Sequence, residues 1–195
     1  MSEKRKKKWK RLPRQFYSRP VLVVAKELLG KLLVRKTPAG SIVARIVEVE
    51  AYGGSDDPAS HAFRDITERN RVMFGEPGFA YVYFIYGNHY CLNVKAEIEG
   101  VPGAALIRAA EIVEGLELAC KNRKTISFAD LANGPGKLTK AMDVTKVHNG
   151  LDLAKSDELF ICEPEENEKL QISTSSRIGI KKGTDKLWRF YTRAR

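Results

Sequence analysis

The sequence predicts a single α+β domain with a largely antiparallel sheet. Residues 15–195 contain runs of β-branched and aromatic residues that come in pairs joined by short turns, which is typical of β-hairpins. Helical patterns occur between these pairs but do not alternate regularly with single strands, so a parallel βαβ arrangement is not favoured. No linker and no internal repeat divides this part of the chain.

The individual elements follow from local patterns. Apolar residues at helical spacing predict a helix from residue 18 to the glycine at position 30. Strands are expected at residues 31–36, 42–52, 79–86, 90–94, 103–109, 159–162, 170–176 and 187–192, and further helices at residues 111–123 and in a short segment that ends at residue 142.

The formal net charge of +10 is concentrated at one end of the chain. Residues 1–14 hold eight basic residues and one acidic residue. We expect this segment to be a disordered tail that precedes a domain of residues 15–195. Such a tail would draw the protein toward phosphate backbones, or it would be only a solvated tail or a localisation signal.

Composition argues against several classes of protein. No apolar run approaches the roughly 20 residues of a membrane helix, and the N-terminus lacks the apolar core of a secretory signal. The three cysteines form no CxxC pair, and the three histidines lack metal-site spacing. We therefore predict reduced cysteines, no metal, no other cofactor and no membrane association.

The strand at residues 42–52 carries two acids beside an aromatic ring. By alternation, one face of this strand is expected to hold Ile42, Ala44, Ile46, Glu48, Glu50 and Tyr52. A strand that buries aliphatic side chains has no structural need for two carboxylates, which indicates a functional site. The simpler alternative is that this face emerges into solvent near residue 48.

The strands at residues 79–86 and 90–94 form an aromatic hairpin whose turn is Gly87-Asn88. Phe84 and Tyr90 are interpreted as core residues. Tyr86 adjoins the tip, where burial is difficult, and would suit a wedge between stacked bases.

The turn Gly134-Pro135-Gly136-Lys137 is not a Walker motif, because Leu131 replaces the first glycine and Leu138 follows the lysine. It is either a simple helix-entry turn or a site for one backbone phosphate near Lys137 and Lys140.

Seven segments of the chain occur in the order and spacing of one known family. They are Glu48-Val49-Glu50-Ala51-Tyr52, His61, Arg69-Asn70-Arg71, the run from Tyr81 to Gly87, Cys91-Leu92-Asn93, Arg108, and Gly134-Pro135-Gly136-Lys137-Leu138. From about Phe16 to near its C-terminus, the chain resembles the alkyladenine (3-methyladenine) DNA glycosylases of the mammalian type. The resemblance implies a compact domain with a curved antiparallel sheet and a protruding hairpin.

The resemblance also implies an activity in base excision repair. An enzyme of this type flips an alkylated or deaminated purine out of double-stranded DNA and hydrolyses its N-glycosidic bond, leaving an abasic site. Glu50 corresponds to the general base that activates water, and Arg108 corresponds to the neighbouring arginine that contacts the phosphate of the target nucleotide. Glu48, on the same strand face, is expected to be a hydrogen-bonding partner.

Four further residues correspond to the pocket for the flipped base. Tyr52, His61 and Tyr83 match the residues that enclose the base. Asn93 matches the residue that crowds the exocyclic amine of guanine and so excludes it.

The remaining matched residues correspond to contacts with the duplex. Tyr86 matches the residue that fills the vacated place through the minor groove. The side chains expected on the DNA backbone are Arg69, Arg71, Lys137 and Lys140.

A non-enzymatic binder of damaged DNA is the main alternative, because it would need the same aromatic and basic features. A lyase that attacks with a lysine is not expected, since no lysine lies in the matched base-pocket motifs. We expect a monomer located in the cytoplasm or nucleoid of a bacterium or in the nucleus of a eukaryote. The lesion range stays open among 3-methyladenine, 7-methylguanine, hypoxanthine and ethenoadenine.

Overall fold

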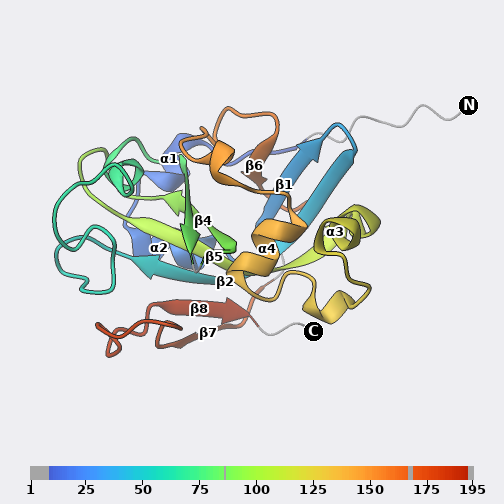
Figure 1. Ribbon diagram of the computed structural model, residues 1–195. Coiled ribbons are helices and arrows are strands. Elements are labelled where there is room, and N and C mark those ends of the chain that lie inside the picture. Colours follow the sequence, from blue (N-terminus) through green and yellow to red (C-terminus); the bar gives the residue numbers. More distant parts are fainter. Residues whose placement is uncertain (1–8, 86, 167–168, 193–195) are drawn as a thin grey trace, which may run out of the picture.

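The fold is built on one antiparallel sheet that curves as a half-barrel (Figure 1). The computed structural model describes residues 9–85, 87–166 and 169–192. The strands are β1 (Leu32–Thr37), β2 (Gly40–Tyr52), β3 (Ala80–Ile85), β4 (His89–Lys95), β5 (Ala104–Glu114), β6 (Leu159–Cys162), β7 (Ile172–Ser175) and β8 (Arg189–Thr192). The helices are α1 (Arg14–Tyr17), α2 (Val21–Glu27), α3 (Leu116–Arg123) and α4 (Pro135–Ala141), with 3-10 turns η1 (Arg71–Phe74), η2 (Phe128–Asp130) and η3 (Lys146–His148).

Strand β2 is the central element of the sheet. The strand order is β3-β4-β5-β2-β1-β6, and β8 pairs with both β2 and β7. One edge of β2 pairs with β5, while the other edge pairs first with β1 and then, at residues 48–50, with β8. The predicted α+β class and the curved, largely antiparallel sheet are thus confirmed.

A β-bulge interrupts β2 at Val47, and it corrects one prediction from the sequence. Ile46 pairs with Ala110 and Glu48 pairs with Ala109, so Val47 has no partner on β5. An extra residue reverses the alternation of side chains beyond it. Ile46 therefore faces the main core, whereas Glu48 faces the opposite side of the sheet, and strict alternation over residues 42–52 was wrong.

The main core lies on the face of the sheet that α2 and α4 cover. Before the bulge β2 contributes Ala44 and Ile46 to this core, and after it Val49 and Ala51. Glu48 and Glu50 still share a face, as predicted, because the register shift between Glu48 and Val49 skips Arg108 on β5 and no residue of β2. The bulge thus keeps aliphatic side chains in the core along the whole strand and directs both acids away from it.

The boundary between β5 and α3 differs from the expected helix at residues 111–123. Strand β5 continues to Glu114, and the helix begins only after Gly115. Gly115 has a φ of 77°, and a Cβ atom there would lie 2.2 Å from the backbone oxygen of Ser41. Only glycine fits this sharp turn, so it sets where the strand stops.

The packed part of the chain begins before residue 15, where the sequence placed the start of the domain. Leu12 is buried, and its amide donates to the carbonyl oxygen of Ile161 at 2.9 Å. The ring of Trp9 lies edge-on to Phe160, with 6.1 Å between ring centroids. Residues 9–14 therefore pack beside β6, while residues 1–8 of the expected tail lie outside the described residues.

Lys95, at the end of β4, is fully buried and holds the connection to β5. Its ammonium donates to the backbone carbonyl oxygens of Ala96, Glu97 (3.0 Å), Ile98 (3.3 Å) and Val101 (2.9 Å). A buried charge is tolerated when its hydrogen-bonding capacity is satisfied. These bonds fix the turn that joins β4 to β5, two strands that contribute to the site described below.

We predict that Lys95→Met lowers the free energy of unfolding by about 3 kcal/mol, because it leaves several buried carbonyl groups without a donor. Urea denaturation measures the change. Lys121→Met, at an exposed position of α3, is the matched control and should change stability by less than about 0.5 kcal/mol. Equal effects of the two substitutions would show that the carbonyl contacts add no stability.

Candidate active site

One register row across five strands forms the floor of the site. Tyr81 on β3 pairs with Asn93 on β4, and Asn93 pairs with Leu106 on β5. Leu106 pairs with Glu50 on β2, and Glu50 pairs with Arg189 on β8. Paired residues in a sheet point to the same face. Residues that are far apart in the sequence are thus brought side by side on the face away from the main core.

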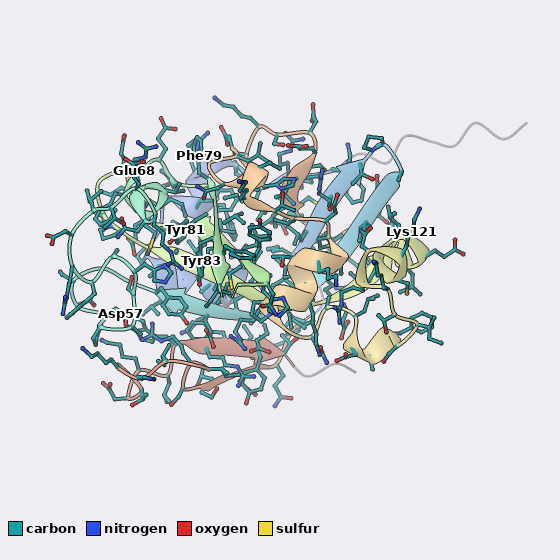
Figure 2. The ribbon with its side chains drawn as sticks, in the orientation of Figure 1. Asp57, Glu68, Phe79, Tyr81, Tyr83 and Lys121 are labelled. Carbon is teal, nitrogen blue, oxygen red and sulfur yellow. The ribbon has the colours of Figure 1, made fainter. Side chains whose placement is uncertain are left out.

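A pocket of about 750 Å³ opens over this floor. Its lining includes six of the residues singled out from the sequence, namely Tyr52, His61, Tyr83, Asn93, Arg108 and Lys137. Figure 2 shows Tyr81 and Tyr83 close together along β3 near the middle of the molecule, while Lys121 lies at its periphery. The pocket lies within the size range of ligand sites in proteins, roughly 300 to 1,000 Å³.

The Glu50 carboxylate is held directly behind the pocket wall, and its side chain has 0% exposure. The Tyr52 hydroxyl donates to Oε2 at 2.8 Å, and the backbone amide of Ile178 donates to Oε1 at 2.7 Å. The Nε atom of Arg108 lies 3.4 Å from Oε1. Burial raises the pKa of Glu50, although Arg108 and the two hydrogen bonds offset part of this effect.

Glu48 lies in a different electrostatic setting. Its Oε1 atom accepts hydrogen bonds from Nε of Arg108 at 2.8 Å and from Nε of Arg189 at 2.6 Å. Burial alone would raise the pKa of Glu48, but the two guanidinium groups outweigh burial and lower it. Glu48 therefore behaves as a fixed anion that orients Arg108, in line with the supporting part expected for it.

Two rings from β3, Tyr81 and Tyr83, and one from the loop after β2, His61, form an aromatic wall of the pocket. Nδ1 of His61 lies 2.8 Å from the Tyr81 hydroxyl, and the His61 and Tyr83 rings meet edge to face at 4.6 Å. Partial removal from water and the charge of Arg69 lower the pKa of His61, so its imidazole is neutral at pH 7. Burial raises the pKa of Tyr81 to about 12 and that of Tyr83 further, so both phenols stay neutral.

Asn93 is fixed by its neighbour on β3. Its Nδ2 atom donates to the carbonyl oxygen of Tyr81 at 3.1 Å, and the side chain is almost fully buried on the pocket wall. This bond holds the amide plane in one orientation, so the group presents a constant shape to anything in the pocket.

The basic residues expected on a DNA backbone do not form one group. Arg69 lies over the Tyr83 ring at 5.4 Å and donates to the carbonyl oxygen of Phe84. Lys137 lines the pocket but is ion-paired with Asp130. Arg71 and Lys140 are exposed and do not line the pocket, and Arg71 lies 3.4 Å from Glu68. Tyr86 lies outside the described residues.

Several residues of the site were not predicted from the sequence. Tyr81 lies two residues before Tyr83 on β3, so strand alternation alone would have placed both side chains on the same face, toward the pocket. Arg189 and the Ile178 amide approach Glu50 from the last quarter of the chain, and no local pattern marks them. The same is true of the loop at residues 178–182, which forms another part of the pocket wall.

No helix among the described residues is both long and apolar enough to cross a membrane. In the same ranges, no cluster of three or more histidine, cysteine, aspartate or glutamate side chains is arranged to hold a metal ion.

The chemistry available to the site follows from these contacts. A carboxylate with a raised pKa, held by neutral donors beside a pocket, can accept a proton or stabilise a positive charge that develops nearby. A wall of neutral aromatic rings suits a flat ligand, including a cationic one. Together they describe a site for an aromatic ring system next to a general base.

We predict that Glu48→Gln lowers the pKa of Glu50, because a neighbouring negative charge is removed and Arg108 is freed to pair with the remaining carboxylate. Carbon-13 NMR titration of labelled glutamate carboxyl groups in the free protein measures this. Glu117→Gln, on exposed α3, is the control and should leave the titration unchanged. A Glu50 pKa that stays constant or rises in Glu48→Gln would contradict the shared arginine.

Comparison with known proteins agrees with this geometry. Residues 15–195 match the family model described as methylpurine-DNA glycosylase. The chain is 50% identical over 184 residues to a protein of Methanocella arvoryzae, and the aligned region covers 92% of this chain and 91% of the relative. It is 48% identical over 182 residues to one of Chlorobium phaeobacteroides (93% and 91%) and 50% identical over 179 residues to one of a Wolbachia strain from Brugia malayi (92% and 95%). All three carry the name "Putative 3-methyladenine DNA glycosylase". The chain belongs to the methylpurine-DNA glycosylase family.

Proposed function

We propose that the protein is a base-excision-repair DNA glycosylase that releases alkylated or deaminated purines from double-stranded DNA. It hydrolyses the N-glycosidic bond with a Glu50-activated water and leaves an abasic site. The observation that carries this proposal is the buried carboxylate of Glu50 beside a pocket walled by Tyr52, His61 and Tyr83. The family and the names of the relatives support 3-methyladenine as one substrate.

The pocket requires the target base to leave the duplex. A purine in stacked DNA cannot reach a carboxylate behind a pocket wall, so the nucleotide must be flipped at a cost of a few kcal/mol. Tyr86 is proposed to offset part of this cost by filling the gap in the duplex. Lys137 and Arg69 near the pocket, with Arg71 and Lys140 further out, are proposed to neutralise phosphates.

The neutral aromatic wall favours damaged bases. Alkylation at N3 or N7 leaves a purine cationic, and a cation over an aromatic ring gains on the order of 0.5 to 2 kcal/mol. The rings of Tyr52, Tyr83 and His61 carry no positive charge of their own, although Arg177 lies over Tyr52 and Arg69 lies over Tyr83. Asn93 is proposed to crowd the exocyclic amine of guanine and so exclude normal guanine.

The chemical step uses the difference between the two acids. As the glycosidic bond stretches, the sugar gains oxocarbenium character, which an ionised Glu50 stabilises while it accepts a proton from the attacking water. Arg108 favours the ionised form of Glu50 and is proposed to contact the phosphate of the target nucleotide. Glu48 is proposed to keep Arg108 in place.

We propose that the protein acts as a monomer and without a cofactor. Its partner is damaged double-stranded DNA, so it is expected in the compartment that holds the chromosome: the bacterial cytoplasm or nucleoid, or the eukaryotic nucleus.

The activity is tested by incubating duplexes that carry 3-methyladenine, 7-methylguanine, hypoxanthine or ethenoadenine and measuring the released base. We predict that Glu50→Gln slows release by at least about 10²-fold, since a general base contributes roughly 10² to 10⁴ to the rate. Binding to the same duplexes should persist. Undiminished release by Glu50→Gln would overturn the mechanism, and binding without release by the wild-type protein would favour the non-enzymatic damage binder.

Borohydride trapping tests the absence of lyase activity. Lys137, Lys181 and Lys182 line the pocket, but the first is ion-paired with Asp130 and the other two are exposed. A lysine is nucleophilic as its free amine, which burial in an apolar pocket favours. We predict that reduction during turnover yields no covalent protein–DNA adduct. An adduct that disappears on substitution of one of these lysines would identify a Schiff base instead.

A further inference from the structure

A fully buried ion pair joins two loops beside the pocket. Arg177 and Asp57 have no exposed side-chain surface. Their contact is bidentate, with Nη1 2.6 Å from Oδ2 and Nη2 2.7 Å from Oδ1. Nε of Arg177 is buried without a hydrogen-bond partner. Removing two charges from water is costly, and a buried pair is weak evidence of a stabilising element. The pair therefore suggests a part in the function of the site.

The two side chains hold the backbone on both sides of Tyr52. Nη1 of Arg177 donates to the carbonyl oxygen of Ala51 at 2.9 Å, and the amide of Gly53 donates to Asp57 at 3.0 Å. The guanidinium carbon of Arg177 also lies 4.7 Å from the centre of the Tyr52 ring. Tyr52 is thus restrained at its backbone and at its ring.

The residue that follows Arg177 contacts the proposed general base. The amide of Ile178 donates to Oε1 of Glu50, and the Tyr52 hydroxyl donates to Oε2. Two donors that hold the carboxylate therefore come from residues that the ion pair restrains. The other titratable or charged groups that act on Glu50 are Glu48, Cys91, Arg108 and Arg189.

We propose that Asp57 and Arg177 form a positioning pair for Glu50, which fixes the Ile178 amide and the Tyr52 hydroxyl against the two carboxylate oxygens. The pair touches no substrate. It acts through its neighbours, by keeping the catalytic carboxylate hydrogen-bonded and in one orientation as the pocket fills. The inference rests on the proposed function, because it names what holds the base of that reaction in place.

The alternative is a brace that only stabilises the loops. A brace would change the free energy of unfolding when it is weakened but would leave the ionisation of Glu50 unaltered. A positioning pair changes that ionisation, because a hydrogen bond to the charged form of a carboxyl group favours that form. The two ideas therefore differ in a measurable quantity.

The test uses the full chain with Arg177→Lys, which keeps the positive charge but loses the bidentate contact with Asp57. Ile178→Pro removes the amide donor and changes neither side chain of the ion pair, so it serves if the first variant folds poorly. Ile178→Ala retains the amide. Arg19→Lys is the matched control, because Arg19 also makes a bidentate contact, with exposed Glu27.

Two readouts are needed. The first is the pKa of Glu50 in the free protein, from carbon-13 NMR of labelled carboxyl groups. The second is the pH profile of single-turnover base release from duplex DNA methylated with dimethyl sulfate. Loss of one donor should raise the pKa by about one pH unit in Arg177→Lys and Ile178→Pro. The acid limb of the pH–rate profile should shift to higher pH by the same amount. At pH values below the Glu50 pKa, base release should therefore be roughly tenfold slower than in the wild type.

Arg19→Lys should match the wild type in both readouts. Ile178→Ala should give the same Glu50 pKa as the wild type. A Glu50 pKa that is unchanged in folded Arg177→Lys would overturn the positioning pair and leave a brace, whatever Ile178→Pro shows. If Arg177→Lys folds poorly, an unchanged Glu50 pKa in Ile178→Pro would overturn it. If the wild-type protein released no methylated base, the proposed function would fail, while the NMR titration would still decide whether the pair positions Glu50.

Discussion

The bulge at Val47 is the constraint on which the site depends. Strand β2 must fill the main core along its whole length, yet it also carries two carboxylates that cannot be left among aliphatic side chains without a large desolvation cost. One extra residue resolves this conflict by exchanging the two faces of the strand midway. The pairing of β2 with β5 shifts register on both sides of Glu48. The second shift leaves Arg108 of β5 without a pairing partner on β2, and the Arg108 side chain contacts both Glu48 and Glu50.

The two acids that emerge from this arrangement are made different by their neighbours. Glu48 accepts from two guanidinium groups, which hold its pKa down, whereas Glu50 is fully buried and accepts from a phenol and a backbone amide. Two titratable groups whose environments push their pKa values apart are typical of sites for acid and base chemistry. The structure thus gives the two carboxylates different environments, although both lie on the same face of one strand.

The walls of the pocket come from the sheet and from loops, and the two contribute different things. The sheet supplies side chains in fixed register, such as Tyr81, Tyr83 and Asn93, whose positions are set by pairing. The loops supply backbone donors and the buried pair of Asp57 and Arg177, which tie residues 51–53 to the segment around Ile178. A floor in fixed register with walls from loops suits the proposed function, in which the site admits a flipped nucleotide and holds a carboxylate in place.

The sequence by itself determined the α+β class, the antiparallel hairpins, most strands, and the common face of Glu48, Glu50 and Tyr52. These features follow from local chemistry: two-residue alternation, turn residues and short-range spacing. The roles of Glu50, Tyr52, His61, Tyr83 and Asn93 came from the family resemblance, and the structure adds that four of them line one pocket with Glu50 behind its wall. Only the tertiary structure decided the bulge that sets which face the acids occupy, the pairing of β8 with β2, and the approach of Arg189, Arg177 and Ile178. The contacts of β8, Arg189, Arg177 and Ile178 join residues more than a hundred positions apart, and the bulge depends on pairing with a strand some sixty positions away. One of these contacts uses a backbone amide that any residue except proline would provide, so no local pattern in the sequence predicts them.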